Sequence, residues 1–186
     1  MKVASNKILS LFNYRVARVA MGICLVFLSA QASIPLKPVP ISLYSVGVLI
    51  LALCYKKNEA RQAMVGFVAI GAMGAPVFAN FGAGLPVLLG PTGGYLIGMI
   101  LCVYVVTALR EKFGEDSWIK LIAYSAIGSA CLFIIGVPYL AMHIGFAKAT
   151  QFGLYPFIIP GIVKAFFTGS SIRLLKQVNN EKKDKV

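Results

Sequence analysis

The residue with the clearest potential for ligand chemistry is Lys164, the only charge well inside a predicted span, about halfway along the apolar segment 155–175. A lysine is costly inside a membrane, so it marks a functional site unless its long stem carries the charge to the interface. We expect Pro160, one turn earlier, to unwind the helix and release backbone carbonyls. A cation at this depth favours a ligand with an anionic group such as a carboxylate.

The second candidate is Asn80, in the uncharged segment 77–89, which is rich in glycine and proline. Its amide offers donors and an acceptor, and Phe78 and Phe81 flank it, which suits a neutral polar ligand group. The alternative is a turn residue, because asparagine tolerates unusual backbone angles. Irregular backbone at a membrane is tolerated where it is buried or lines a cavity. The segment is therefore either a binding loop or a plain external turn.

Other kinds of chemistry lack the residues they need. The sequence has one histidine, His143, and its four cysteines show no metal-ligand or CxxC spacing. Paired carboxylates, a nucleophile with its base, and a GxxxxGK[ST] phosphate loop are all missing. We therefore predict no catalytic residue, no metal and no cofactor. All six acidic residues lie outside the apolar segments, so any transport would draw its energy from a partner rather than from buried carboxylates.

The elements that position these residues are membrane-spanning helices. Hydrophobic residues make up 59% of the 186 residues and charged residues 13%, whereas a soluble domain carries about 25% charged residues. About 20 apolar residues span a bilayer, so we predict one all-α domain of six transmembrane helices, the second of them short. The predicted spans are 16–34, 41–55, 61–76, 90–109, 118–142 and 155–175, followed by a charged, frayed tail over 176–186.

The basic residues predict how these spans lie in the membrane. Most Lys and Arg residues, which give a net charge of +12, come before the first span, after every second span, or in the tail. Lys37 and Lys148 fall on the opposite side. Because cytoplasmic loops carry the excess of Lys and Arg, we predict that both termini face the cytoplasm and that the chain resides in the cytoplasmic membrane.

Small residues predict that another helix or a ligand can approach the backbone closely in two places. Ala17, Ala20 and Cys24 lie on nearly one face of the first span, where a helix of this chain or of another subunit can approach. The run GPTGGYL at 90–96 opens the fourth span, and its glycines permit close approach to a helix or a ligand.

Three parts of the sequence together resemble a known family. They are the proline-rich segment 34–43, the pair 76–79 and 90–96, and the segment 155–164 at the start of the sixth span. In order and spacing they resemble the BioY family, the biotin-specific substrate-binding subunits of energy-coupling-factor vitamin transporters. The likeness covers nearly the whole chain, and GPTGGYL is its most specific part.

The resemblance implies six helices with an externally open pocket under the first and third loops, and biotin as the ligand. It also implies partners, namely a transmembrane coupling subunit and two ATP-binding-cassette ATPases. In the family the first helix meets the coupling subunit through an AxxxA pair, for which this chain offers Ala20 and Cys24. The family usually has an aspartate three residues before the lysine. That position is Gly161 when the sequences are aligned on Lys164, and Ile162, with one residue deleted, when they are aligned on Pro160 and Gly161. The ureido group must then bond elsewhere, and either affinity is lower or the ligand is a relative of biotin.

The predicted function is biotin capture and uptake as the substrate-specific subunit of an ATP-driven transporter. We hypothesise that Asn80 bonds the ureido edge and that Lys164 helps neutralise the carboxylate. The rings of Phe78, Tyr95 and Tyr139 would bury the apolar bicycle. Further predicted site residues lie at the start of the fourth span and in the first loop: Thr92, Gly93, Pro38, Pro40 and Ser42.

Two other functions stay open at this point. A ligand-free scaffold membrane protein would need neither the uncharged loop nor the buried lysine. An autonomous carrier for a biotin-like vitamin would have to work without intramembrane carboxylates.

Overall fold

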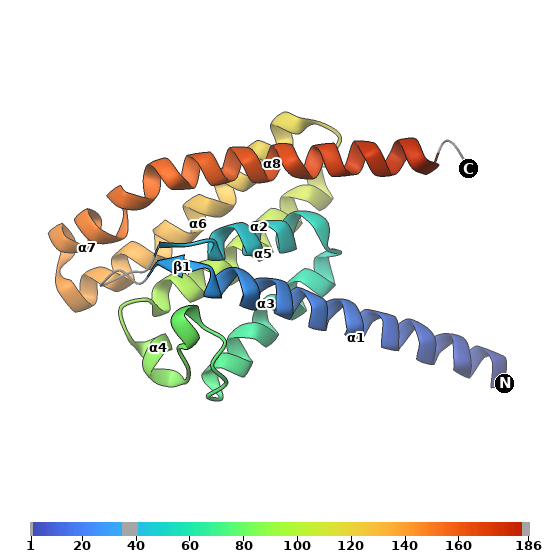
Figure 1. Cartoon of the computed structure of the whole chain (residues 1–186), viewed down its shortest axis with the longest axis horizontal. Coiled ribbons are helices and arrows are strands. Elements are labelled where there is room, and N and C mark those ends of the chain that lie inside the picture. The colour runs from blue at the N-terminus through green and yellow to red at the C-terminus, as the bar shows by residue number, and fades with distance from the viewer. Residues whose placement is uncertain (1, 35–40, 184–186) are drawn as a thin grey trace.

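Long apolar runs form the main helices of the computed structural model, which describes residues 2–34 and 41–183 (Figure 1). The longer helices are α1 (Lys2–Gln31), α2 (Tyr44–Cys54), α3 (Lys57–Ala72), α5 (Gly93–Phe113), α6 (Trp118–Ile144) and α8 (Tyr155–Lys183). Shorter helical elements are η1 (Ala79–Phe81), α4 (Leu85–Leu89) and α7 (Phe146–Gly153). Each predicted span overlaps one longer helix, so the helical class of the fold is confirmed.

A short ribbon adds to the helices at the end of α1. β1 (Ser33–Ile34) pairs antiparallel with β2 (Ile41–Ser42), with Ser33 opposite Ser42. The ribbon flanks the proline-rich segment 35–40, where proline lacks the N–H that a helix requires. The first helix therefore ends at Gln31, earlier than the predicted end at residue 34.

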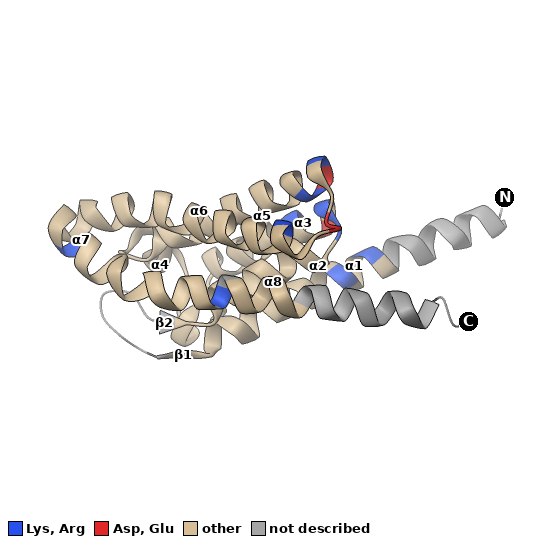
Figure 2. Ribbon diagram, turned by 90° about the horizontal axis from the view of Figure 1, so that it is seen from above, with Lys and Arg blue, Asp and Glu red and all other residues tan. Residues whose placement is uncertain are grey.

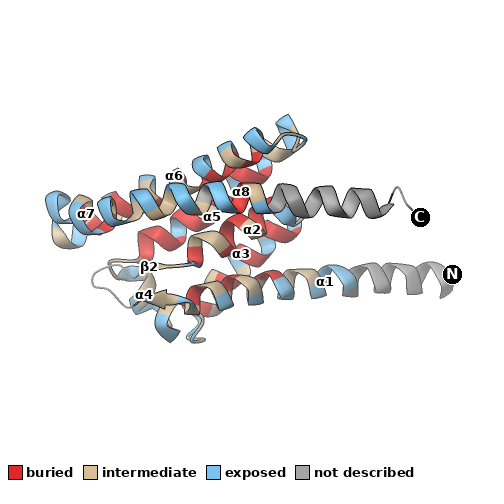
Figure 3. Cartoon of the chain, turned by 45° about the horizontal axis from the view of Figure 1, so that its top comes forward, coloured by how far each residue is buried: buried red, intermediate tan, exposed pale blue. Residues whose placement is uncertain are grey.

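The core lies where α2, α3 and α5 meet. α5 packs along α6 and also contacts α2 and α3, while α1 packs against α2 and α3, and α8 against α6 and α2. Figure 3 shows the buried residues concentrated in these central helices. The largest fully buried side chains include Leu49, Leu53, Met64, Phe67 and Val103. This packing fixes the helices whose ends surround the site.

The outer faces of the helices suit a lipid environment. Large apolar side chains are exposed on α1, α6 and α8, among them Met21, Leu28, Ile134, Ile159 and Phe167. Within the described residues, four helical stretches are long and apolar enough to cross a membrane: Tyr14–Gln31, Gly93–Phe113, Trp118–Ile144 and Phe146–Ser171. At 1.5 Å per residue, α2 with its 11 residues is about 16 Å long, roughly half of a 30 Å hydrocarbon core.

Most of the charged residues that Figure 2 colours lie at one end of the molecule, near the start of α3 and the end of α5. Arg18 pairs with Glu59 at 2.8 Å, and Arg110 pairs with Glu115 at 2.6 Å. Arg110 also donates through Nη1 to the Ala52 carbonyl at 2.6 Å, which caps the C-terminal end of α2. The ribbon, α4 and α7 lie toward the opposite end (Figures 1 and 2).

The start of α8 corrects the prediction for Pro160. The helix runs without interruption through Pro160, so the prediction that this residue unwinds the backbone is wrong. Proline removes the hydrogen bond to the carbonyl four residues earlier, and here that carbonyl belongs to Pro156 in the first turn. The helix also continues to Lys183, so most of the charged tail is helical rather than frayed.

Candidate functional site

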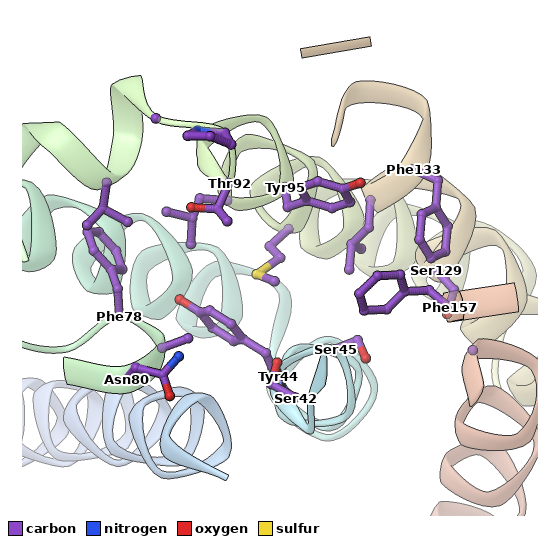
Figure 4. A pocket seen from close by; sticks show the side chains of 18 of the residues that line it. Ser42, Tyr44, Ser45, Phe78, Asn80, Thr92, Tyr95, Ser129, Phe133 and Phe157 are labelled. Atoms are coloured by element: carbon purple, nitrogen blue, oxygen red, sulfur yellow. Dashed lines mark hydrogen bonds between the residues drawn. The ribbon is translucent and has the colours of Figure 1, made fainter. Parts of the chain in front are cut away.

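A cavity of about 350 Å³ lies among β2, the start of α2, the loop between α3 and α5, and helices α5, α6 and α8 (Figure 4). Its volume falls in the range of small-molecule pockets, about 300–1,000 Å³. Apolar and aromatic side chains form most of its walls, with a small number of polar groups among them. This composition is typical of a pocket that buries an apolar ligand and orients it with few polar contacts.

Six of the predicted site residues line this one cavity. They come from four separate parts of the sequence and are Ser42, Phe78, Asn80, Thr92, Tyr95 and Lys164. The fold therefore brings the lysine, the amide and two aromatic rings to the same space. The sequence predicted from residue type that these side chains belong to one site, and the packing of the helices brings them close together.

Two other predicted residues stand behind the wall rather than in it. Tyr139 and Gly93 are not among the residues that line the cavity, and their contact with the ligand stays a prediction. The Tyr139 hydroxyl donates to the Leu88 carbonyl at 3.1 Å. A Cβ atom added to Gly93 would overlap that same carbonyl group, so glycine is required for the close approach. Tyr139 thus ties α4 to α6, and Gly93 allows α4 to approach the start of α5.

The remaining predicted residues lie elsewhere. Pro38 and Pro40 fall outside the described residues. Ala17, Ala20 and Cys24 are exposed on α1, away from the lining of the cavity. This exposed face is available to another helix.

Lys164 joins α8 to the first loop. Its Nζ donates to the Ser42 carbonyl oxygen at 2.6 Å, and its side chain is half-buried at the cavity wall. An ammonium group has three donors, and the contact with Ser42 uses one of them. The same group can therefore hold β2 in place and present N–H donors to an anionic ligand.

Asn80 lies in a left-handed turn and also lines the cavity, so its position is compatible with both roles that the sequence left open. Its backbone is left-handed, at φ 55° and ψ 37°, a conformation that asparagine tolerates better than most residues. Its side chain also lines the cavity, and its Oδ1 accepts a hydrogen bond from the Ser33 hydroxyl at 3.0 Å. This contact directs the carboxamide and leaves its NH₂ group as a donor.

Tyr44 is a site residue that the sequence did not reveal. Its hydroxyl is buried and has no hydrogen-bond partner among the described residues. Its ring packs edge-on against Phe67 at 5.7 Å, and Phe67 packs against Phe78 at 5.8 Å. Figure 4 shows the hydroxyl directed into the region between Phe78 and Thr92. An unsatisfied buried hydroxyl costs about 1–3 kcal/mol, which makes it a candidate partner for a polar ligand atom.

An aromatic wall on the other side was also missed. Phe133 lies between Tyr95 and Phe157, with both ring-centroid distances at 6.4 Å, and all three residues line the cavity. Ser45 and Ser129 add hydroxyls to the lining. The sequence signal that could have revealed these two serines is a polar residue within a strongly apolar helix.

Within the described residues, no three His, Cys, Asp or Glu side chains cluster to hold a metal ion.

Known proteins share this sequence pattern. The profile of the BioY family matches residues 4–181. The chain belongs to the BioY family. It is 36% identical over 159 residues to the "Biotin transporter BioY" of Thermotoga maritima, which covers 85% of this chain and 93% of that protein. It is 31% identical over 166 residues to the "Probable biotin transporter BioY" of Rickettsia prowazekii, with 89% and 85% covered.

A solved structure shares the fold of this BioY protein. It is the crystal structure of "the S-component for biotin from an ECF-type ABC transporter", with a TM-score of 0.76 and 23% sequence identity. The match covers 92% of this chain and 93% of the other. The two chains therefore share one helical fold.

Proposed function

We propose that this chain binds biotin and serves as the substrate-binding subunit of a biotin uptake system. The observation that carries the proposal is an apolar cavity with the ammonium of Lys164 and the carboxamide of Asn80 in its wall. Biotin has an apolar bicycle, a polar ureido edge and a carboxylate, so its groups match that wall. Family membership and the names of the BioY relatives support the same ligand.

The polar groups divide between the two ends of biotin. Lys164 receives the carboxylate, and Asn80 bonds the ureido edge. The hydroxyl of Tyr44, lacking a partner among the described residues, is a second group for a polar ligand atom. The Gly161 position lines the cavity, and a Cβ atom there would meet no atom within 4 Å. Because this position carries no carboxylate, the hydrogen bonds to the ureido group come from Asn80 and Tyr44.

The subunit itself is non-catalytic and works with partners. We propose six transmembrane helices with both termini and the charged end in the cytoplasm, following the excess of Lys and Arg there. The cavity then opens to the outside of the cytoplasmic membrane. A transmembrane coupling subunit meets the exposed face of Ala17, Ala20 and Cys24 on α1, and two ATP-binding-cassette ATPases supply the energy. The cavity argues against a ligand-free scaffold.

Binding of biotin to purified protein tests the proposal. We expect wild-type protein to bind biotin more tightly than biotinamide, which lacks the negative charge. Lys164→Met should weaken biotin binding by roughly tenfold to a hundredfold, the value of a hydrogen bond to a charged group, and should remove the preference over biotinamide. Lys148→Met, which alters an exposed lysine on α7, is the matched control. Unchanged affinity in both Lys164→Met and Asn80→Ala would reject the assignment.

Two further measurements separate the alternatives. A thermal-shift screen with biotin, desthiobiotin, lipoate, thiamine and riboflavin identifies the ligand, and stabilisation by another vitamin alone would overturn biotin. Uptake of radiolabelled biotin by cells that lack the other subunits tests for an autonomous carrier. We expect no concentrative uptake in those cells.

A further inference from the structure

Gln31, the last residue of α1, uses its whole carboxamide to hold the loop between α3 and α5. Its Nε2 donates to the carbonyl oxygens of Val77 and Phe78, at 3.3 Å and 3.0 Å. Its Oε1 accepts from the backbone N–H of Phe81 at 3.1 Å. These three contacts lie on both sides of Asn80, so one side chain spans the turn that presents the proposed ligand-binding amide.

The turn at Asn80 needs such support because its backbone is strained. Asn80 and Phe81 both have positive φ angles, 55° and 57°, which L-residues other than glycine rarely adopt. Such conformations persist where surrounding contacts fix them. The Phe78 N–H donates to the Gly82 carbonyl at 3.0 Å and closes the turn from within. Gln31 supplies the contacts that fix it from outside.

Gln31 also connects the turn to a helix that is mostly exposed. Of the four spanning stretches in the described residues, Tyr14–Gln31 and Phe146–Ser171 are much less buried than the other two. α1 contacts α2, α3 and η1, and its exposed face includes Ala17 and Ala20. Because a helix moves as a stiff rod over this length, the position of α1 determines where the carboxamide of Gln31 lies.

We propose that Gln31 is a positioning residue for ligand capture. It fixes the left-handed turn so that the Asn80 side chain faces the cavity, and it makes the shape of this loop depend on the position of α1. The proposal rests on the proposed binding of biotin. It adds that a change at the end of α1 acts on affinity through Asn80, although Gln31 does not line the cavity.

Hydrogen exchange and biotin affinity of two variants test the role. Gln31→Met keeps the length of the side chain and removes all three hydrogen bonds, while Gln31→Glu keeps the acceptor for Phe81 and loses both donors. In ligand-free protein we expect faster exchange across 77–82 in Gln31→Met, including the amide of Phe81. Biotin affinity should fall roughly tenfold, the value of one to two net hydrogen bonds. Gln151→Met, at an exposed glutamine on α7, should change neither.

A double-mutant cycle separates positioning from general loss of stability. If Gln31 acts through Asn80, Gln31→Met should weaken affinity much less in an Asn80→Ala background than in wild type. Additive losses, or unchanged exchange across 77–82, would overturn the positioning role. Failure of the wild-type protein to bind biotin would instead reject the proposed function. Wild-type binding with Gln31 variants of equal affinity rejects only the role of Gln31.

Discussion

The two walls of the cavity are held in different ways. The wall formed by the loop between α3 and α5 is tied at both of its ends, to α1 through Gln31 and to α6 through Tyr139. The opposite wall joins α8 to β2 through the hydrogen bond from Lys164 to the Ser42 carbonyl. There a Cβ atom added to Gly161 would meet no atom within 4 Å.

This difference indicates which side responds to a ligand. The loop wall is built before the ligand arrives, so Phe78 and Asn80 offer a fixed surface. The α8 wall uses the ammonium of Lys164 to hold β2 and, in our proposal, the same group to bind the ligand. A carboxylate that binds Lys164 therefore shares the ammonium group with the Ser42 carbonyl of β2.

The largest effect is expected from emptying the loop wall. Phe78 is 1% exposed and packs against Phe67, so Phe78→Ala should lower the free energy of unfolding by about 3–5 kcal/mol. Biotin binding should fall with it. Phe81→Ala is the matched control, because Phe81 lies in the same turn and is 64% exposed. Chemical denaturation in detergent measures the free energy of unfolding of both variants. Equal losses in Phe78→Ala and Phe81→Ala would contradict a loop wall that is already packed without the ligand.

Gly94, in the first turn of α5 next to the loop wall, can be compared with Gly161 in the α8 wall. A Cβ atom at Gly94 would overlap the Tyr139 side chain, whereas one at Gly161 would enter open space. Overpacking costs about 1–3 kcal/mol, so Gly94→Ala should be destabilised by that amount and Gly161→Ala should unfold like the wild type. Thermal unfolding of the two variants measures the difference. A large loss in Gly161→Ala would mean that the α8 wall is as tightly packed as the loop wall.

The sequence predicted the helices well because apolar runs of membrane length are a direct signal. It also predicted that Lys164 and Asn80 belong together, from residue chemistry and family resemblance. It did not reveal which residues of α6 line the cavity, because that depends on how the helix is rotated. Tyr139 and Phe133 lie on the same apolar helix, and only Phe133 of the two is among the lining residues.

Long-range contacts explain the other failures. Tyr44 lines the cavity because α2 begins beside Phe67 and Phe78, and Gln31 contacts backbone groups 46 to 50 residues later in the chain. Neither contact has a local sequence signature. Pro160 was misjudged because the loss of one backbone hydrogen bond, to the Pro156 carbonyl, does not interrupt α8.

The hydroxyl of Tyr44 should affect binding more than stability. Tyr44→Phe keeps the ring contact with Phe67 and removes a buried hydroxyl that lacks a partner among the described residues. The ligand-free protein should be as stable as the wild type or slightly more so, while biotin affinity falls roughly tenfold. Tyr155→Phe, at an exposed tyrosine at the start of α8, is the control. Lower stability with unchanged affinity would show that the hydroxyl serves the fold and not the ligand.

The smallest effect is expected at Tyr139, which supports the loop wall from behind. Tyr139→Phe removes the hydrogen bond to the Leu88 carbonyl and should lower the free energy of unfolding by about 0.5–1.5 kcal/mol. The neighbouring contact between His143 Nε2 and the Leu89 carbonyl, at 2.9 Å, stays in place, so α4 keeps its position and biotin affinity should change less than twofold. Hydrogen exchange across 86–90 and a binding isotherm measure the two effects. If affinity fell as far as in Tyr44→Phe while stability held, Tyr139 would contact the ligand after all, and the loop wall would have to open when biotin binds.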